Sequence, residues 1–144
     1  MSNSPICVDA NLVIRLVVDP DDELVRSTWD RWDANHRHLA APTLLFCKVS
    51  NALYRYQRAG QMSGEGAQLA LRAALSLPLR LYGEADLHTR ALDLAGRFSL
   101  PAAYDAHHLA LADWLGAEFW TADRRLVRAV RGALPWVRAL DVDG

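Results

Sequence analysis

The feature that most constrains the fold of this chain is a regular alternation of short apolar runs with longer amphipathic segments. Short apolar runs, and at 78–82 an alternation of apolar and polar residues, predict five strands, at residues 6–8, 38–41, 78–82, 119–121 and 136–140. Apolar positions recurring every three or four residues predict helices between them, at 12–18, 21–35, 42–59, 63–77, 84–98, 103–115 and 122–130. Strands that alternate with helices predict a mostly parallel sheet covered on both faces. Without a linker or an internal repeat, residues 1–144 are expected to form one α/β domain.

Composition narrows the class of protein further. An apolar fraction of 51% excludes a disordered chain, and a net charge of −1 gives no overall basic field for nucleic acid. No apolar run approaches the ~20 residues of a membrane-spanning helix, so we expect a soluble protein of a reducing cytoplasm, without membrane contact. Cys7 and Cys47 each lie in an apolar run and are expected to be reduced thiols of the core. The five tryptophans lie in apolar stripes and strands, which favours core or dimer contacts over base stacking.

Several residues are expected to set the helix ends. Pro42 suits the first turn of a helix, Ser63 suits an N-cap, and Gly60 and Gly116 suit C-terminal ends. The helix over residues 63–77 is expected to bury Leu69, Ala73 and Leu77.

Three aspartates stand where an α/β fold collects its chemistry. Asp9 ends the first predicted strand, Asp105 lies in the first turn of a predicted helix, and Asp123 follows the strand at 119–121. Side chains at the carboxyl ends of parallel strands converge at one edge of the sheet. Converging carboxylates repel unless a cation lies between them, and Mg²⁺ or Mn²⁺ prefers oxygen ligands. Each aspartate alone is explained by helix capping, but polar Asn11 and Thr121, two residues from an aspartate each, favour a shared site.

The segments 8–13, 104–112 and 121–126 resemble the signature segments of PIN domains. More narrowly, the whole chain is similar to the VapC-type ribonuclease toxins of bacterial toxin–antitoxin pairs. The resemblance implies a three-layer α/β/α sandwich with a four- or five-stranded, mostly parallel sheet. It also implies an endoribonuclease that hydrolyses RNA phosphodiesters with Mg²⁺ or Mn²⁺. Such toxins are usually homodimers, and a small cognate antitoxin neutralises them.

The resemblance assigns roles to particular residues. It implies that Asp9, Asp105 and Asp123 are catalytic and hold the metal. Asn11 and Thr121 match small polar positions that support the metal or its water. Arg124 and Arg125 are candidates for RNA-phosphate contacts, although a solvated helix surface also explains them.

Lys48 breaks the family pattern, because it occupies the position of a fourth acid, a glutamate. It is the only lysine of the chain, and no acidic residue lies between Asp33 and Glu65 to replace the glutamate. The exchange changes the net charge of the metal-free site from about −4 to about −2. At a separation of ~4 Å and an effective dielectric constant near 20, each interaction between unit charges is worth about 4 kcal/mol. A protonated ammonium cannot ligate metal. We therefore expect Lys48 to neutralise the aspartates itself, with weak or absent metal occupancy and little nuclease activity.

Two origins of Lys48 stay open. One is natural divergence into a pseudoenzyme or a branch with another chemistry. The other is an acquired inactivating substitution, since one base change converts a glutamate codon into a lysine codon. The competing function is a catalytically inactive PIN-fold protein that binds RNA or an antitoxin through a surface that includes Lys48.

The sequence does not fit three other classes of phosphate-handling protein. A haloacid dehalogenase-type phosphatase needs a second acid where this chain has Asn11, and a receiver domain needs its lysine late in the chain. A nucleotide-binding protein of the Walker or dinucleotide type needs a glycine-rich phosphate loop, which this sequence lacks. His107 and His108 are adjacent on a helix and therefore diverge, which favours packing or surface roles over a shared metal. Arg55 and Arg58 are candidates for contacts with RNA or an acidic antitoxin segment, or for simple solvation.

Overall fold

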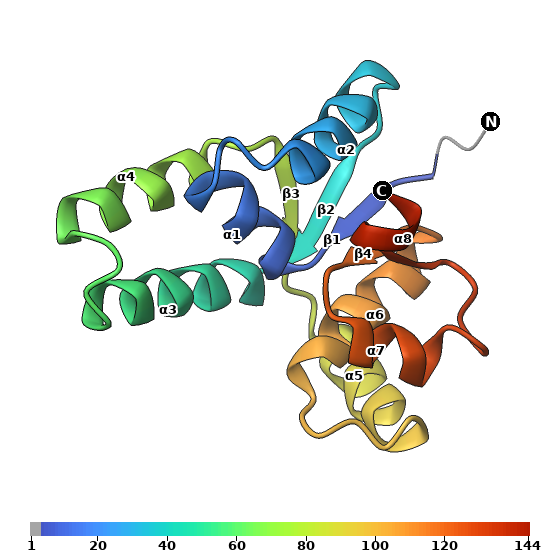
Figure 1. The fold of residues 1–144 in the computed structure, drawn as a ribbon. Coiled ribbons are helices and arrows are strands. Elements are labelled where there is room, and N and C mark those ends of the chain that lie inside the picture. Colours follow the sequence, from blue (N-terminus) through green and yellow to red (C-terminus); the bar gives the residue numbers. More distant parts are fainter. Residues whose placement is uncertain (1–3) are drawn as a thin grey trace.

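A five-stranded sheet forms the centre of the computed structural model, which describes residues 4–144 (Figure 1). All four strand pairings are parallel, in the order β3-β2-β1-β4-β5. Strand β1 lies in the middle of the sheet, with β2 and then β3 on one side of it. Strands β4 and β5 follow on the other side of β1. The strands are β1 (Ile6–Val8), β2 (Leu39–Pro42), β3 (Leu79–Tyr82), β4 (Glu118–Thr121) and β5 (Val137–Ala139).

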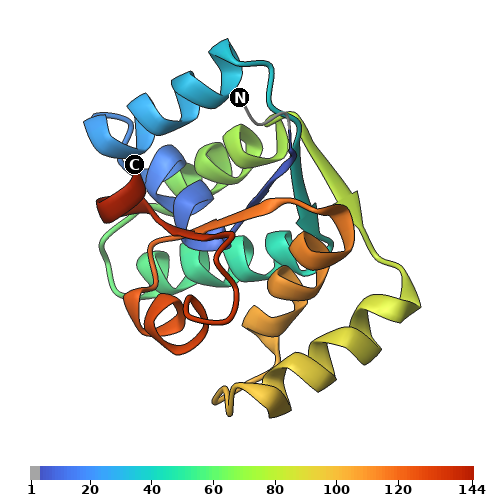
Figure 2. The ribbon, with the colours of Figure 1, turned by 90° about the vertical axis from the view of Figure 1, so that its right-hand side faces the viewer.

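Helices cover both faces of this sheet (Figures 1 and 2). In the described residues they are α1 (Ala10–Val18), α2 (Glu23–Ala34), α3 (Leu44–Arg58), α4 (Gly64–Leu75), α5 (Ala85–Arg97), α6 (Tyr104–Leu115), α7 (Arg124–Val130) and α8 (Leu140–Asp143). Side chains of α1 to α4 and α8 pack in one core cluster, and those of α5 to α7 pack in another. Adjacent strand residues alternate between the two clusters: Ile6 and Val8 lie in the first, Cys7 in the second. The expected three-layer α/β/α sandwich is confirmed.

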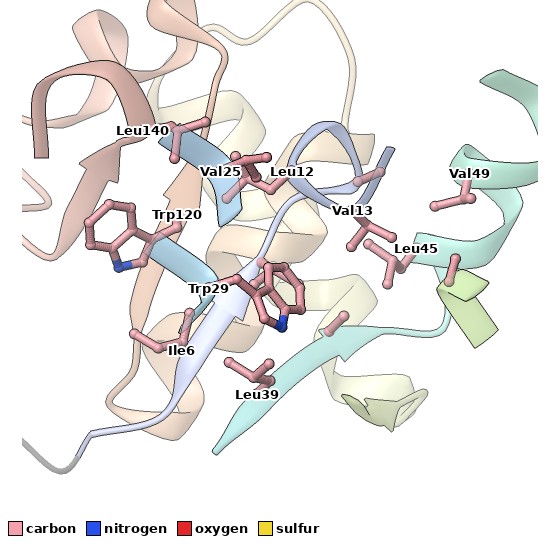
Figure 3. Packing of buried hydrophobic residues seen from close by; sticks show 14 of the residues in the cluster. Ile6, Leu12, Val13, Val25, Trp29, Leu39, Leu45, Val49, Trp120 and Leu140 are labelled. Carbon is pink, nitrogen blue, oxygen red and sulfur yellow. The ribbon is translucent and has the colours of Figure 1, made fainter. Parts of the chain in front are cut away.

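Three tryptophans build much of the first cluster. The ring centroid of Trp32 lies 5.3 Å from that of Trp29 and 5.3 Å from that of Trp120. Figure 3 shows Trp29 and Trp120 on the face of the sheet that also receives Leu12 of α1. These contacts confirm a core role for three of the five tryptophans, whereas Trp114 is 46% exposed.

The helix ends agree with the sequence at most positions. Ser63 Oγ accepts a hydrogen bond from the Gly66 amide, 2.9 Å away, and so caps α4. Gly60 and Gly116 follow the ends of α3 and α6 with φ of 74° and 63°, a conformation that suits residues without a Cβ. Pro42 is an exception. It is the last residue of β2, paired with Tyr82 of β3, and α3 begins two residues later.

Two further expectations were wrong, and one short helix was missed. Helix α4 buries Ala67, Ala70 and Ala74, whereas Leu69 is 57% exposed and Ala73 is exposed too. Ala67, Ala70 and Ala74 belong to the first core cluster, and Ala70 and Ala74 each lie one position after the predicted Leu69 and Ala73. Cys47 is exposed, and only Cys7 is a core thiol. The short helix α8 was not expected at all.

No helix within residues 4–144 is both long enough and apolar enough to cross a membrane.

Candidate active site

The fold brings the predicted acidic residues to the carboxyl edge of β1 and β4. Asp9 follows β1 and caps α1, with its Oδ1 atom 2.7 Å from the Ala10 amide. Asp123 follows β4 and caps α7, accepting from the amides of two residues of that helix. Asp105 lies in the first turn of α6. Strand order reverses between β1 and β4, so this edge is the switch point at which open α/β sheets bind their ligands.

The side chain of Lys48 reaches this edge from another helix, α3. Lys48 lies in the first half of α3, the helix that follows β2, so its side chain starts from the same end of the sheet. Its Nζ atom donates to Asp9 Oδ1 at 3.1 Å and to Asp105 Oδ1 at 3.2 Å. One ammonium therefore joins two carboxylates that stand far apart in the sequence. The side chains of Lys48, Asp9 and Asp105 are 26%, 4% and 36% exposed.

Neighbouring groups shift the pKa of Asp9 and of Lys48 in the direction opposite to the effect of burial. Burial opposes ionisation of Asp9, yet the charge of His108 at low pH, the charge of Lys48, and hydrogen bonds from Thr121 and Lys48 hold the pKa of this carboxyl below its usual value. Burial also opposes the charge on Lys48, but the carboxylates of Asp9 and Asp105 raise the pKa of its ammonium above the ordinary value. At neutral pH the site therefore contains an ionised Asp9 and a protonated Lys48.

Asp105 differs from Asp9, because burial and repulsion from Asp9 raise its pKa despite the nearby ammonium. Asp105 also makes fewer contacts. Asp9 accepts from Thr121, Asn11, Lys48 and a backbone amide, whereas within residues 4–144 the Asp105 side chain accepts a hydrogen bond from Lys48 alone. Asp9 is thus the anchored acid of the pair.

Asn11 and Thr121 hold Asp9 from the side away from Lys48. Thr121 Oγ1 donates to Asp9 Oδ2 at 2.8 Å, and Asn11 Nδ2 lies 3.1 Å from that hydroxyl and 3.3 Å from the carboxylate. Asn11 Oδ1 accepts from the Ala122 amide, and Thr121 Oγ1 accepts from the Asp123 amide. The network ties the end of β4 and the start of α7 to Asp9, so both polar residues orient acids in this structure.

His108 lies behind Asp9, a position that the sequence did not reveal. Its imidazole is fully buried, and Nε2 lies 3.9 Å from Asp9 Oδ1 without a hydrogen-bond partner among the described residues. Burial lowers its pKa to about 4, so the ring is neutral at pH 7. A neutral ring adds no charge to Asp9, and Lys48 is therefore the cation that compensates Asp9 at neutral pH. The only signal in the sequence was the position of His108 three residues after Asp105, one helical turn along the same face.

The two arginines that were candidates for RNA contacts, Arg124 and Arg125, have different surroundings. Arg124 is exposed and forms an ion pair with Asp141 of α8, so its guanidinium is held at the C-terminal segment. Arg125 is also exposed, on the first turn of α7 beside Asp123. Their contact with RNA stays a prediction.

A shallow pocket of about 310 Å³ unites the candidate residues. All three aspartates line it, together with Asn11, Lys48, Asn51 and Arg55. A larger hollow of about 590 Å³ lies beside the edge of the sheet around Arg37 and Tyr82 and contains none of the predicted site residues. The smaller pocket is the candidate site, because it alone gathers the acids.

The residues present do not fit the divalent metal that the family resemblance implies. Within residues 4–144, no three acidic, histidine or cysteine side chains are arranged to hold one metal ion. The space between Asp9 and Asp105 holds the Lys48 ammonium, whose three N–H groups donate and cannot ligate a cation. Asp9 Oδ1, the oxygen nearest to both Lys48 and His108, is already engaged.

Solved structures share this fold. No model of a known family matches the sequence, and no curated protein matches it. The crystal structure of PAE2754 from Pyrobaculum aerophilum is 25% identical, with a TM-score of 0.68 over 91% of this chain and 83% of that one. A toxin–antitoxin complex from Klebsiella pneumoniae gives 17% identity and a TM-score of 0.64 over 94% and 97% of the two chains. VapC20 of Mycobacterium tuberculosis, a toxin that cleaves the sarcin–ricin loop, gives 19% and 0.59 over 85% and 94%. The chain therefore has the fold of VapC-type PIN toxins.

Proposed function

We propose that this chain is the toxin of a VapC-type toxin–antitoxin pair, in which Lys48 occupies the place of the metal and suppresses RNA hydrolysis. Two findings support the proposal. The fold is shared with toxins over almost the whole chain, and the acids meet at the switch point of the sheet. The observation that carries the loss of activity is the Lys48 ammonium, 3.1 and 3.2 Å from two of the three acids.

The residues of the pocket are poor substitutes for the hydrolytic machinery of a nuclease. Cleavage of a phosphodiester by water requires a group that takes a proton from the water. Lys48 is protonated, because its carboxylate neighbours raise its pKa, and cannot act as that base. Asp9 is buried, and its lowered pKa makes it a weak base. Divalent metal, in intact members of the family, supplies the activated water and neutralises phosphate charge.

Binding of RNA is compatible with the same pocket. Two of the three N–H groups of Lys48 donate to carboxylates, which leaves one for an acceptor such as a phosphate oxygen. Arg55 lines the pocket seven residues further along α3 and is exposed. The second candidate function, an inactive PIN-fold protein that binds RNA or an antitoxin, rests on these two cations. A small antitoxin, a homodimeric state and a cytoplasmic location are parts of the same proposal.

The test is a paired cleavage assay of this chain and its Lys48→Glu variant on RNA with Mg²⁺ or Mn²⁺. We expect little cleavage by the chain as it stands and clear metal-dependent cleavage by Lys48→Glu. Lys48→Gln is the matched control, because it removes the ammonium without supplying an acid, and we expect it to remain poorly active.

Two results would be decisive against parts of the proposal. Strong metal-dependent cleavage by the unmodified chain would refute the inhibitory role of Lys48. Failure of Lys48→Glu to bind metal or cleave RNA, with retained binding of RNA or an antitoxin by the unmodified chain, would favour the inactive binding protein. In cells, the proposal predicts growth arrest on expression of Lys48→Glu without an antitoxin, and no arrest by the unmodified chain.

A further inference from the structure

Two histidines from different helices meet outside the acidic pocket. His88 lies in the first turn of α5, and His107 lies in the first turn of α6. His88 Nδ1 and His107 Nε2 are 2.9 Å apart, and the two ring centroids are 5.1 Å apart. His88 is exposed and His107 is half-buried, so the pair is open to solvent on one side. The proposed toxin activity does not use this pair.

The protonation of His107 is fixed by the backbone. Its Nδ1 atom lies 2.7 Å from the carbonyl oxygen of Ala103, one turn earlier. A carbonyl only accepts, so Nδ1 carries the proton and donates it there. In the neutral ring, Nε2 then presents a lone pair toward His88. A backbone carbonyl behind the other ring nitrogen is the arrangement that orients histidine ligands in metal sites.

The spacing of the two nitrogens, which are hydrogen-bonded in the metal-free protein, already matches that of two neighbouring ligands of one ion. With metal–nitrogen bonds of about 2.0–2.1 Å, a separation of 2.9 Å corresponds to an angle of about 90° at the ion. A tetrahedral ion such as Zn²⁺ needs an angle near 109° and hence a wider separation, about 3.3 Å. Square-planar and octahedral ions accept two neighbouring ligands at right angles, and imidazole suits Ni²⁺ and Cu²⁺.

We propose that His88 and His107 form a two-histidine site for a divalent transition-metal ion of the Ni²⁺ or Cu²⁺ class, with water in the remaining positions. In the metal-free protein, His88 Nδ1 donates a hydrogen bond to His107 Nε2. On binding, His88 takes its other tautomer, with the proton on Nε2, and Nδ1 turns its lone pair to the ion. Mg²⁺ and Mn²⁺ prefer oxygen ligands and are not expected at this pair.

Occupation of the site would join the first turns of two helices. Asp105 lies two residues before His107 in the same turn of α6, and the segment 98–103 connects α5 to that turn. A bridging ion therefore restrains the turn that positions Asp105. The site has its own ligands, and its existence does not depend on whether the chain cleaves RNA.

The test is calorimetric titration of the folded chain with Ni²⁺ in excess Mg²⁺, which occupies oxygen-rich sites. We expect one saturable Ni²⁺ site that His88→Ala weakens by at least about tenfold, since even outer-shell partners of a metal ligand contribute that much. His36→Asn is the matched control. His36 is an exposed histidine with φ of 55°, a conformation that asparagine tolerates, and its replacement should leave Ni²⁺ affinity unchanged.

Two further readouts keep the proposal open to refutation. Bound paramagnetic Ni²⁺ should broaden the NMR resonances of the His88 and His107 rings, and Zn²⁺ should bind more weakly than Ni²⁺. Equal Ni²⁺ affinity of the chain and His88→Ala, broadening centred elsewhere, or tighter binding of Zn²⁺ than of Ni²⁺ would each overturn it.

Discussion

Replacing Lys48 by methionine tests whether its ammonium holds the acidic site together. Methionine keeps the length and apolar stem of the side chain but removes the charge that lies 3.1 Å from Asp9 and 3.2 Å from Asp105. At such separations and an effective dielectric constant near 20, each attraction is worth about 5 kcal/mol before desolvation. The variant leaves a buried carboxylate without its cation, so we expect a loss of stability.

The net loss is smaller than the Coulomb energy, because Lys48 itself gains hydration when the protein unfolds. Breaking a fully buried pair by removing one partner costs about 3–5 kcal/mol, whereas an exposed pair contributes about 1 kcal/mol or less. Asp9 is 4% exposed, Lys48 26% and Asp105 36%, which places the site between these limits. We expect Lys48→Met to lower the free energy of unfolding by about 2–3 kcal/mol at pH 7, with most of the loss from Asp9.

The assay is equilibrium urea unfolding at pH 7, with Arg55→Met as the matched control. Arg55 is a second cation of α3 that lines the same pocket, and no ion pair involves it within residues 4–144. Its replacement should change stability by less than about 0.5 kcal/mol. Adding Asp105→Asn to Lys48→Met should recover part of the loss, because it removes the repulsion on Asp9. If Lys48→Met is as stable as Arg55→Met, the reasoning is wrong.

Three further predictions concern groups around this site and at helix ends. Burial lowers the pKa of His108 from 6.5 to about 4, so between pH 6.5 and pH 4 the imidazole becomes protonated in the unfolded chain but not in the folded one. His108 therefore costs up to about 3 kcal/mol of stability by pH 4, and urea unfolding of His108→Leu across pH should show a shallower decline; an unchanged slope contradicts this. Thr121→Val removes the donor to Asp9 and should destabilise by about 1–3 kcal/mol, with Thr121→Ser recovering most of it; a neutral valine variant would contradict the network. Gly116→Ala should cost about 1 kcal/mol at φ 63°, whereas Gly96→Ala inside α5 should be neutral or stabilising, so equal shifts in melting temperature would argue against the assigned backbone conformations.

Much of the strand pattern was readable from the sequence, because β1, β2 and most of β4 are short apolar runs in a sheet covered on both faces, whereas β3 was recognised by its alternation. The run 6–8 is followed directly by Asp9, and the run 119–121 ends in Thr121 with Asp123 two residues later, which marked both the strand ends and the candidate site. Parallel pairing then brought Asp9 and Asp123 to one edge without further information. The position of Lys48 against Asp9 and Asp105 agrees with the expectation that its ammonium neutralises them.

Packing details were less accessible to sequence reasoning. The buried side of α4 was misjudged because alanine carries a weak hydrophobic signal, although Ala74 is completely buried and Leu69 is largely exposed. His108 looks like any polar helix residue, and only the tertiary structure places its unpartnered Nε2 near Asp9. The meeting of His88 and His107 depends on the packing of α5 against α6, which no local pattern records.

The most direct test of the central claim is calorimetric binding of Mn²⁺ to this chain and to Lys48→Glu under identical conditions. If the Lys48 ammonium takes the place of the metal, Lys48→Glu should bind Mn²⁺ at one saturable site, and the unmodified chain should bind it at least about tenfold more weakly or without saturation. Equal, saturable binding by both proteins, abolished in each by Asp9→Asn, would contradict the claim that Lys48 occupies the site.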